Sequence, residues 1–333
     1  MRLGGGAADV VRETSNSLLI ALTCDTDADL FDPSIAEGQG ERPPRWRGLD
    51  EGLPTIIDSA TEICDRFGLR PKFTWFVRVD NQLEYYHGDA CYLLNCYNKI
   101  WRSRSTLGDE VAWHPHIYKF ENGHWLHQND EDAFEAALSR AHAQFTRFAG
   151  PPRSSRIGEA AFSNRIAKTL DDLGVDCDST AMPGRERRDA DRVLDWRGTP
   201  ASPYFPSSQD YRRPGIPSRK FLEVPMSMVK VMASYDHHPL LRYVDLSFHP
   251  RAMKEGLQES LSAMRVLVTM THPSGVLPGI RRGGHGLISF DIDAYRSNLE
   301  FILWHCAQSH RAVEFVTISA CRSLFTEHAQ NFQ

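Results

Sequence analysis

The chain has 333 residues, of which 41% are hydrophobic and 24% charged, and 38 basic against 43 acidic side chains give a formal charge of −5. This composition is that of an ordinary globular protein and excludes disordered, collagen-like and coiled-coil chains. The mild negative charge argues against a nucleic-acid partner, which requires a strongly basic face. The 14 histidines stand out, because histidine is the commonest metal ligand and the usual acid/base group near neutral pH.

The cysteines and the N-terminus indicate a cellular compartment. Seven irregularly spaced cysteines without a Cys-x-x-Cys pair predict free thiols in a reducing environment rather than disulfides or a zinc ribbon. Residues 1–16 lack the apolar segment of a signal peptide, and an apolar run long enough to span a membrane is absent. We therefore expect a soluble, cytoplasmic protein. The sequence does not predict its oligomeric state.

Short β-rich segments alternate with helical patterns along most of the chain. We predict strands at 18–24, 72–79, 110–118, 153–157, 175–179, 221–226, 265–271 and 313–318, and helices at 51–67, 82–102, 129–148, 160–173, 251–264 and 291–310. The alternation indicates parallel βα units, and without GxGxxG after a strand or GxxxxGK[ST] the sequence supports neither a dinucleotide-binding nor a P-loop fold. We expect a distorted (β/α) barrel, with chemistry at the carboxyl ends of its strands.

The first predicted strand ends in the acidic motif Asp25-Thr26-Asp27. Because side chains alternate along a strand, Asp25 and Asp27 share one face with the small residues Ala21 and Thr23, and the larger apolar side chains face the helices. Two adjacent carboxylates repel each other, so the pair requires a cation or a shared proton. We favour this functional interpretation over a pair of loop-capping residues.

The third predicted strand ends in His114-Pro115-His116, which places both histidines on one face. Two histidines and one carboxylate form a zinc site with an open position, the arrangement of hydrolases. The alternative is two surface histidines, but HxH and DxD at separate strand ends together favour a metal site. His272 follows the strand at 265–271, where an acid/base role and a strand-capping role are equally supported.

The order of these motifs, from DxD through GDEVAWHPH and Arg-Ile-Gly to Thr-His-Pro, resembles the polysaccharide deacetylase-like family, also called the NodB-homology or chitooligosaccharide deacetylase domain. The resemblance runs from about Leu18 to Ile318, and it is closest to a branch associated with bacterial surface-sugar, including O-antigen, and antibiotic-sugar gene clusters. It implies one α/β domain, a distorted (β/α)7 barrel. The barrel would occupy residues 18–320, with an N-terminal extension at 1–17, an Arg/Pro-rich insert at about 181–220 and a C-terminal tail at 321–333.

The resemblance also implies metal-dependent hydrolysis of an N-acetyl group from an amino sugar. Asp25 resembles the general base, Arg156 the residue that orients it, and His272 the general acid. The implied ligands of a divalent metal ion, expected to be Zn²⁺, are Asp27, His114 and His116.

Further residues would contact the substrate. Asp195 and Trp196 resemble the motif that lines the sugar pocket, and Tyr118 could stack on a sugar face, although buried packing is an equal alternative for Trp196. Many family members carry HxxxH in the second motif, whereas this chain has Tyr118 at the last position. Either His116 replaces the missing ligand or the metal has fewer protein ligands.

The insert carries a set of arginines: Arg185, Arg187, Arg188, Arg192, Arg197, Arg212 and Arg213. They suit the phosphate of a nucleotide- or lipid-linked sugar, because guanidinium binds phosphate through paired hydrogen bonds. For any single arginine, ion pairing at the surface is slightly favoured. We expect a metal-dependent N-deacetylase of a small amino-sugar substrate, and the alternatives are a cyclic-imide or allantoin-type amidohydrolase and a carbohydrate-binding pseudoenzyme.

Overall fold

Every strand pairing in the main sheet is parallel, as the predicted βα alternation requires. The structure, a computed structural model, describes residues 17–30, 42–188, 193–280 and 286–330. Its main sheet has the order β10-β7-β6-β3-β2-β1-β13, and β14 also pairs with β1. The strands of this sheet are β1 (Ser17–Asp25), β2 (Phe73–Arg78), β3 (Glu110–His114), β6 (Ser154–Ser155), β7 (Cys177–Asp178), β10 (Leu222–Glu223), β13 (Val266–Val268) and β14 (Ala312–Phe315). The protein is a single α/β domain with a distorted (β/α)7-like barrel, which confirms the predicted fold class.

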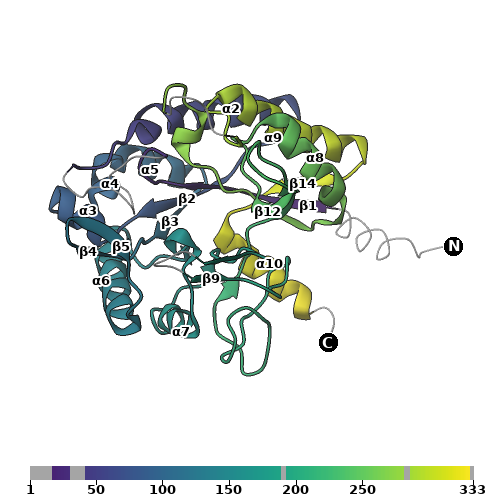
Figure 1. Ribbon diagram of the computed structural model, residues 1–333. Helices are drawn as coiled ribbons and strands as arrows, with labels where there is room; N and C mark the ends of the chain where they lie inside the picture. Colours follow the sequence, from purple (N-terminus) through teal and green to yellow (C-terminus); the bar gives the residue numbers. More distant parts are fainter. Residues whose placement is uncertain (1–16, 31–41, 189–192, 281–285, 331–333) are drawn as a thin grey trace.

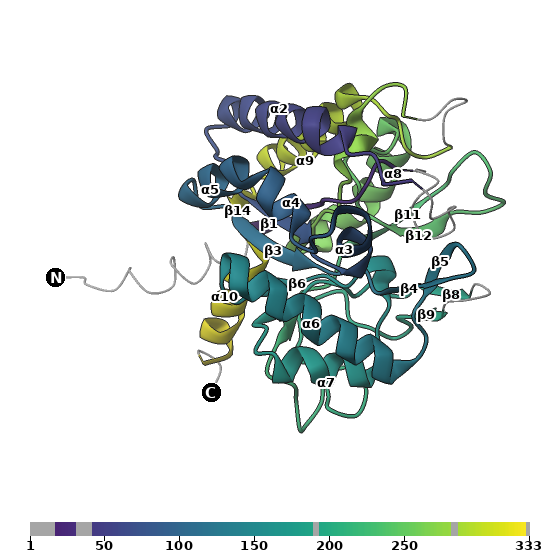
Figure 2. The same ribbon diagram turned by 90° about the vertical axis from the view of Figure 1, so that its left-hand side faces the viewer.

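Helices surround this sheet (Figures 1 and 2). They are α2 (Leu53–Arg66), α3 (Asn81–His87), α4 (Tyr92–Cys96), α5 (Asn98–Thr106), α6 (Glu131–Ala149), α7 (Asn164–Asp172), α8 (Pro250–Ser260), α9 (Ile292–Gln308) and α10 (Ile318–Gln330). Short helical turns are η1 (Gly48–Gly52), η2 (Gly158–Ala160), η3 (Leu261–Ala263) and η4 (Pro273–Val276). Helix α9 packs against both α2 and α8, so these three helices cover one side of the barrel (Figure 1).

Three antiparallel hairpins lie outside the main sheet in the described residues. They are β4 (Tyr118–Glu121) with β5 (His124–His127), β8 (Glu186–Arg188) with β9 (Val193–Asp195), and β11 (Met228–Val231) with β12 (Leu240–Tyr243). The last two hairpins carry residues of the cavity described below.

The two faces of β1 separate two apolar cores, as alternation along the strand predicts. Ile20, Leu22 and Cys24 belong to the large cluster that the helices share. Ala21 belongs to a smaller cluster on the opposite face, together with Phe76 and other inward-facing residues. Burying apolar side chains on both faces stabilises a parallel sheet and fixes its register, because a slip of one residue would exchange the two faces.

Several predicted boundaries are wrong. Residues 82–102 form three helices rather than one: the side chain of Asp80 caps the start of α3, and Gly88, with a φ of 67°, ends it. The predicted strand at 110–118 ends at His114, and Tyr118 begins β4. The β4–β5 hairpin turns at Asn122-Gly123, both with positive φ, which is the residue pair that favours a tight hairpin turn.

The C-terminal region also differs from the expectation. Most of the segment expected as a tail, residues 321–330, lies in α10, and the first turns of this helix bury Ile318 and Cys321 in the smaller core. The α10 helix contacts β7, so it is part of the barrel. Residues 1–16 of the expected N-terminal extension lie outside the described residues.

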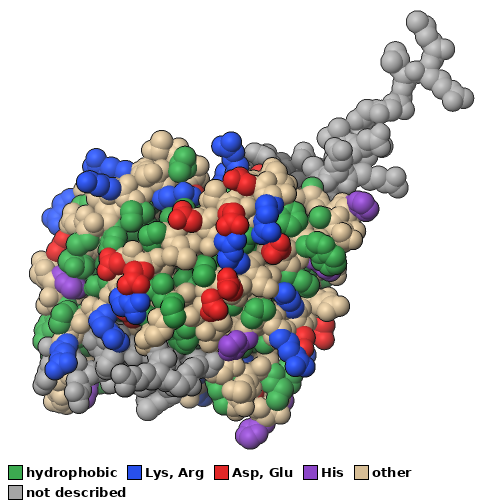
Figure 3. All heavy atoms as spheres, turned by 90° about the horizontal axis from the view of Figure 1, so that it is seen from above, with side chains coloured by type: hydrophobic (Ala, Val, Ile, Leu, Met, Phe, Trp, Pro, Cys, Tyr) green, Lys and Arg blue, Asp and Glu red, His purple; other side chains and the backbone are tan. Residues whose placement is uncertain are grey.

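Opposite charges are mixed on the surface over α2, α8 and α9 (Figure 3). Arg296 pairs with Glu62 and Arg66 with Glu300, and both pairs join α2 to α9. Within the described residues, every helix is too short or too polar to cross a lipid bilayer.

Candidate metal and catalytic site

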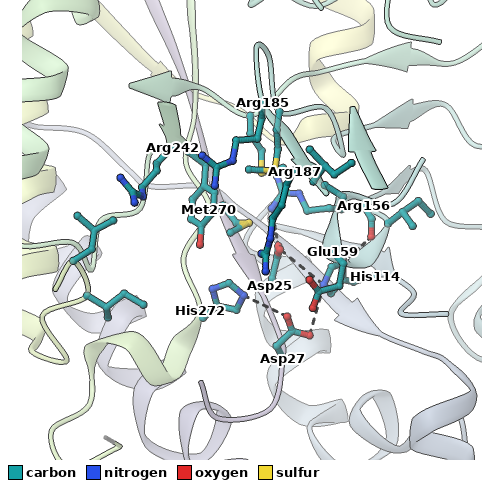
Figure 4. A pocket seen from close by; sticks show the side chains of 18 of the residues that line it. Asp25, Asp27, His114, Arg156, Glu159, Arg185, Arg187, Arg242, Met270 and His272 are labelled. Atoms are coloured by element: carbon teal, nitrogen blue, oxygen red, sulfur yellow. Dashed lines mark hydrogen bonds and ion pairs between the residues drawn. The ribbon is translucent and has the colours of Figure 1, made fainter. Parts of the chain in front are cut away.

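The predicted catalytic and metal-binding side chains meet at one edge of the barrel. Asp25 ends β1, His114 ends β3, Arg156 follows β6, and His272 follows β13. A parallel backbone bridge between Cys24 and Thr271 brings the last segment beside β1. We call the group formed by Asp25, Asp27, His114, His116, Arg156 and His272 the catalytic floor. Its six residues line a cavity of about 350 Å³ (Figure 4).

Three side chains of the catalytic floor form a candidate metal site. One oxygen of Asp27, Oδ1, lies 3.1 Å from Nε2 of His116 and 3.6 Å from Nε2 of His114. The two Nε2 atoms are 3.0 Å apart. Such separations between donors suit one small cation, since zinc–nitrogen bonds of about 2.0–2.1 Å place neighbouring ligands roughly 3 Å apart.

The outer hydrogen bonds of both imidazoles support this assignment. Nδ1 of His114 lies 2.6 Å from the carbonyl oxygen of Arg156, so Nδ1 donates and Nε2 carries the lone pair. Tyr118 donates its hydroxyl to Glu159, which leaves the phenolic oxygen to accept from Nδ1 of His116 at 2.8 Å. Two lone pairs then face each other, and the buried Oδ1 of Asp27 has no hydrogen-bond partner among the described residues. A divalent cation satisfies all three acceptors.

The charges of the site also favour a bound cation. Burial acts to raise the pKa of Asp27, but His116 and His114 lower it more, so the carboxylate is ionised as a ligand must be. Burial acts to lower the pKa of His114, and Asp25 and Asp27 raise it more. The excess negative charge that raises the pKa of this imidazole is the charge that a metal ion would neutralise.

Asp25 is held in place by a buried arginine. Nη1 of Arg156 donates to Oδ1 of Asp25 at 2.6 Å and to Oγ1 of Thr23 at 2.8 Å, and Nε donates to the carbonyl oxygen of Ser179 at 2.9 Å. The guanidinium lies over the ring of Phe76, 4.1 Å from its centroid. Asp25 is 3% and Arg156 1% exposed, so the free oxygen of Asp25 has a fixed position 3.9 Å from Nε2 of His114.

His272 lies on the other side of Asp27, with Nε2 3.3 Å from Oδ2 of that carboxylate. Burial acts to lower the pKa of His272, but the hydrogen bond and charge of Asp27, with Asp25 and Asp245, raise it to about 9. Asp245 is itself buried, which raises its pKa to about 6 against the opposing effect of His272. The sequence analysis missed Asp245, because its proximity to His272 depends on a long-range parallel bridge between Val244 and Thr269.

The three residues predicted to bind substrate lie outside the lining of the cavity. Tyr118 is 2% exposed and positions His116. Trp196 is 1% exposed, packs on Phe162 and Tyr211, and donates its indole N–H to the carbonyl oxygen of Ala160. The packing alternative therefore describes Trp196, and no ring face remains for a sugar.

Asp195 forms surface ion pairs instead. Its carboxylate accepts from Arg197 at 2.9 Å and from Arg212 at 2.8 Å. The Arg197 hydrogen bond is the main cause that lowers the pKa of this carboxyl. Asp195 thus secures the base of the β8–β9 hairpin rather than reaching the cavity.

Other residues complete the cavity wall. We call Arg185, Arg187 and Arg242 the arginine wall; Figure 4 shows them on the upper side of the view, with Asp27 and His272 on the lower side. The sequence analysis singled out the first two within the insert, but Arg242 lies on β12 and had no local sign of a role.

The η2 turn also contributes to the cavity. Glu159 lines it, and both Glu159 and Ala160 have left-handed backbone conformations, with φ values of 57° and 52°. Such strain in residues with a β-carbon is typical of functional sites. The preceding residue is Gly158, and a Cβ there would overlap the imidazole of His116. The turn therefore presses directly against a candidate metal ligand.

Comparison with known proteins finds similarity in structure. A protein from Mycobacterium smegmatis assigned as a polysaccharide deacetylase superposes with a TM-score of 0.53 at 20% identity, over 94% of this chain and 92% of the other. A Parabacteroides distasonis protein assigned as a glycoside hydrolase/deacetylase gives 0.57 at 12% identity, over 94% and 71%. The allantoinase PuuE gives 0.51 at 11% identity, over 92% and 89%.

No protein-family model and no curated protein sequence matches the chain. At these low identities the similarities establish the shared architecture. The chain therefore has the distorted (β/α) barrel fold of these three solved structures, over almost its whole length.

Proposed function

We propose that the protein is a metal-dependent N-deacetylase of the polysaccharide deacetylase-like family. Its substrate would be an N-acetylated amino sugar or a nucleotide- or lipid-linked conjugate, used in bacterial glycan or secondary-metabolite biosynthesis. The observation that carries the proposal is the catalytic floor, where an oriented carboxylate, an Asp/His/His metal site and a cationic imidazole surround one cavity. The fold shared with solved proteins assigned as deacetylases supports the same activity.

Asp27, His114 and His116 would hold the metal, and two imidazoles with one carboxylate are a donor set that favours Zn²⁺. When bound, a divalent ion polarises the amide carbonyl and lowers the pKa of a water molecule toward about 7. Arg156 and Tyr118 support the site from outside by fixing Asp25 and His116.

The remaining steps use the side chains of the chain itself. Asp25 accepts the proton of the attacking water through the oxygen that Arg156 leaves free. His272, with a pKa of about 9, is protonated at neutral pH and donates to the amide nitrogen as the C–N bond breaks. Asp25 lies beside His114 and His272 beside Asp27, and both line the same cavity, so the base and the acid could act on one bound amide.

The test is acetate release by the metal-loaded protein from a panel of nucleotide-linked and free N-acetyl amino sugars, with allantoin hydrolysis measured in parallel. We expect acetate release that stops after metal removal and returns with Zn²⁺. Hydrolysis of allantoin without acetate release would instead support the amidohydrolase alternative. Full metal occupancy with neither reaction would support a carbohydrate-binding pseudoenzyme.

A further inference from the structure

The structure separates the arginines of the insert into two groups. Outside the cavity, Arg197 and Arg212 pair with Asp195, and the exposed Arg188 pairs with Glu186 at 3.2 Å. Arg213 pairs with Asp210, and Arg192 lies outside the described residues. Arg185 and Arg187 line the cavity instead.

A third arginine joins these two from a separate hairpin. Arg242 on β12 is held by Asp236 through two hydrogen bonds of 2.7 and 2.9 Å, which fix the orientation of its guanidinium. Nη1 of Arg185 donates to the carbonyl oxygen of Leu241 at 3.1 Å, so the arginines of both hairpins are tied together. Gly184, with a φ of 77°, allows the chain to approach Leu241 closely just before Arg185.

The charge of Arg185 is not compensated by an ion pair with any described residue. Burial lowers the pKa of its guanidinium, and the like charges of Arg242 and Arg187 lower it further, against smaller opposing effects of Tyr243 and Asp236. Of the carboxylates that line the cavity, Asp25 pairs with Arg156, Asp27 belongs to the metal site, and Glu159 accepts from the hydroxyl of Tyr118. A half-buried guanidinium beside two like charges is unfavourable unless an anion accompanies it.

We propose that the arginine wall binds a phosphate or diphosphate group of the substrate. The inference rests on the proposed deacetylase function, since the N-acetyl group would lie on the catalytic floor of the same cavity. Planar guanidinium groups bind phosphate oxygens through paired hydrogen bonds, and Arg185 and Arg187 line the cavity beside Arg242, which is paired with Asp236. The natural substrate class is therefore a phosphorylated or nucleotide-linked amino sugar rather than a neutral oligosaccharide.

The experiment measures binding of UDP, pyrophosphate and uridine to the full-length, metal-loaded chain by calorimetry. We expect UDP and pyrophosphate to bind and Arg185→Gln to weaken both at least tenfold. Arg188→Gln, on the same hairpin but exposed and paired with Glu186, should change binding less than twofold. Equal affinity for UDP and pyrophosphate would indicate that the diphosphate alone is recognised, and tighter binding of UDP would indicate a nucleoside subsite as well.

Absence of UDP and pyrophosphate binding to the wild type, or equal binding by the wild type and Arg185→Gln, would overturn the proposal. Arg185→Lys provides a second variant, which keeps the positive charge but loses the paired N–H donors of the guanidinium. We expect its affinity for UDP to lie between those of the wild type and Arg185→Gln. The binding measurement does not depend on acetate release. UDP binding through Arg185 by a protein without deacetylase activity would therefore support the phosphate subsite and contradict only the proposed reaction. Conversely, acetate release with the same KM for neutral and phosphorylated sugars would support deacetylation and contradict the subsite.

Discussion

The catalytic floor and the arginine wall face the same cavity but are built in different ways. The floor comes from the ends of barrel strands, and its carboxylate–arginine pair is almost fully buried between two apolar cores. The wall comes from two hairpins outside the main sheet, and its Arg187 is exposed. Under the proposed function, the barrel would fix the reaction and the hairpins would select the substrate.

The energetic consequences differ in the same way. On the floor, Asp25 pairs with Arg156 and Asp27 with His272 at short distance, so removal of one partner leaves a buried charge uncompensated. On the wall, Arg185 is half-buried beside like charges, so an anionic ligand can supply the negative charge that pairs with it. Substitutions on the floor should therefore affect turnover or metal binding, and substitutions on the wall should affect substrate affinity.

The largest effect is expected for Asp25→Asn. The amide keeps the shape of the side chain but cannot accept the proton of water, so kcat should fall by about 10³-fold. Metal content should remain unchanged, since Asp25 is not among the candidate ligands. Steady-state kinetics and metal analysis of the same preparation check both statements, and retained turnover in the metal-loaded variant would remove Asp25 from its role.

Trp196→Ala tests the packing beside the wall, because the backbone N–H of Trp196 donates to the carbonyl oxygen of Arg185 at 2.8 Å. Loss of this buried indole should lower the free energy of unfolding by about 3 kcal/mol, because its contacts with Phe162 and Tyr211 and its bond to Ala160 disappear. Denaturant unfolding measures the change. Unchanged stability with a loss of sugar binding would instead restore the sugar-stacking role predicted from the sequence.

Tyr118→Phe separates support of the metal site from direct ligation. The variant keeps the ring but removes the hydroxyl that orients His116, and metal affinity should fall about tenfold. Competition with a chromogenic chelator measures it. Tyr85→Phe is a matched control, since Tyr85 is 54% exposed and should leave metal affinity unchanged.

The smallest effect is expected on the pH dependence of stability, through the buried carboxyl groups of Asp178 and Glu223. Burial and the nearby Asp178 raise the pKa of Glu223 well above its usual value, so the folded protein keeps a proton that the unfolded chain releases. Its contribution to stability is present at low pH and is lost as pH rises through the raised pKa. Glu223→Gln should reduce this decline by up to about 1.4 kcal/mol per pH unit, measured by denaturant unfolding from pH 5 to 8. An unchanged pH slope would show that Glu223 is ionised.

The sequence predicted the floor better than the wall for a physical reason. Alternation along a strand places Asp25, and the parallel order of strands brings His114 to the same edge, whereas Arg156 was identified from the family resemblance. Glu159 and Arg242 could not be predicted in this way, because a strained turn and a hairpin outside the main sheet position them. One available sign was overlooked, the Asn122-Gly123 pair that ends the β4 strand.

The roles of Tyr118 and Trp196 show a second limit. Their residue types suit sugar stacking and buried packing equally, and only long-range contacts with Glu159 and Ala160 distinguish the two. Motif position placed them near the site, but it could not show which way the rings point.

The most direct test of the account is the metal content of the purified protein. We expect one divalent ion per chain in the wild type and in Asp25→Asn, and a loss of that ion in His116→Ala, because His116 is one of the three candidate ligands. Wild-type protein that remains free of metal after incubation with Zn²⁺, or His116→Ala that binds it as tightly as the wild type, would contradict the proposed centre.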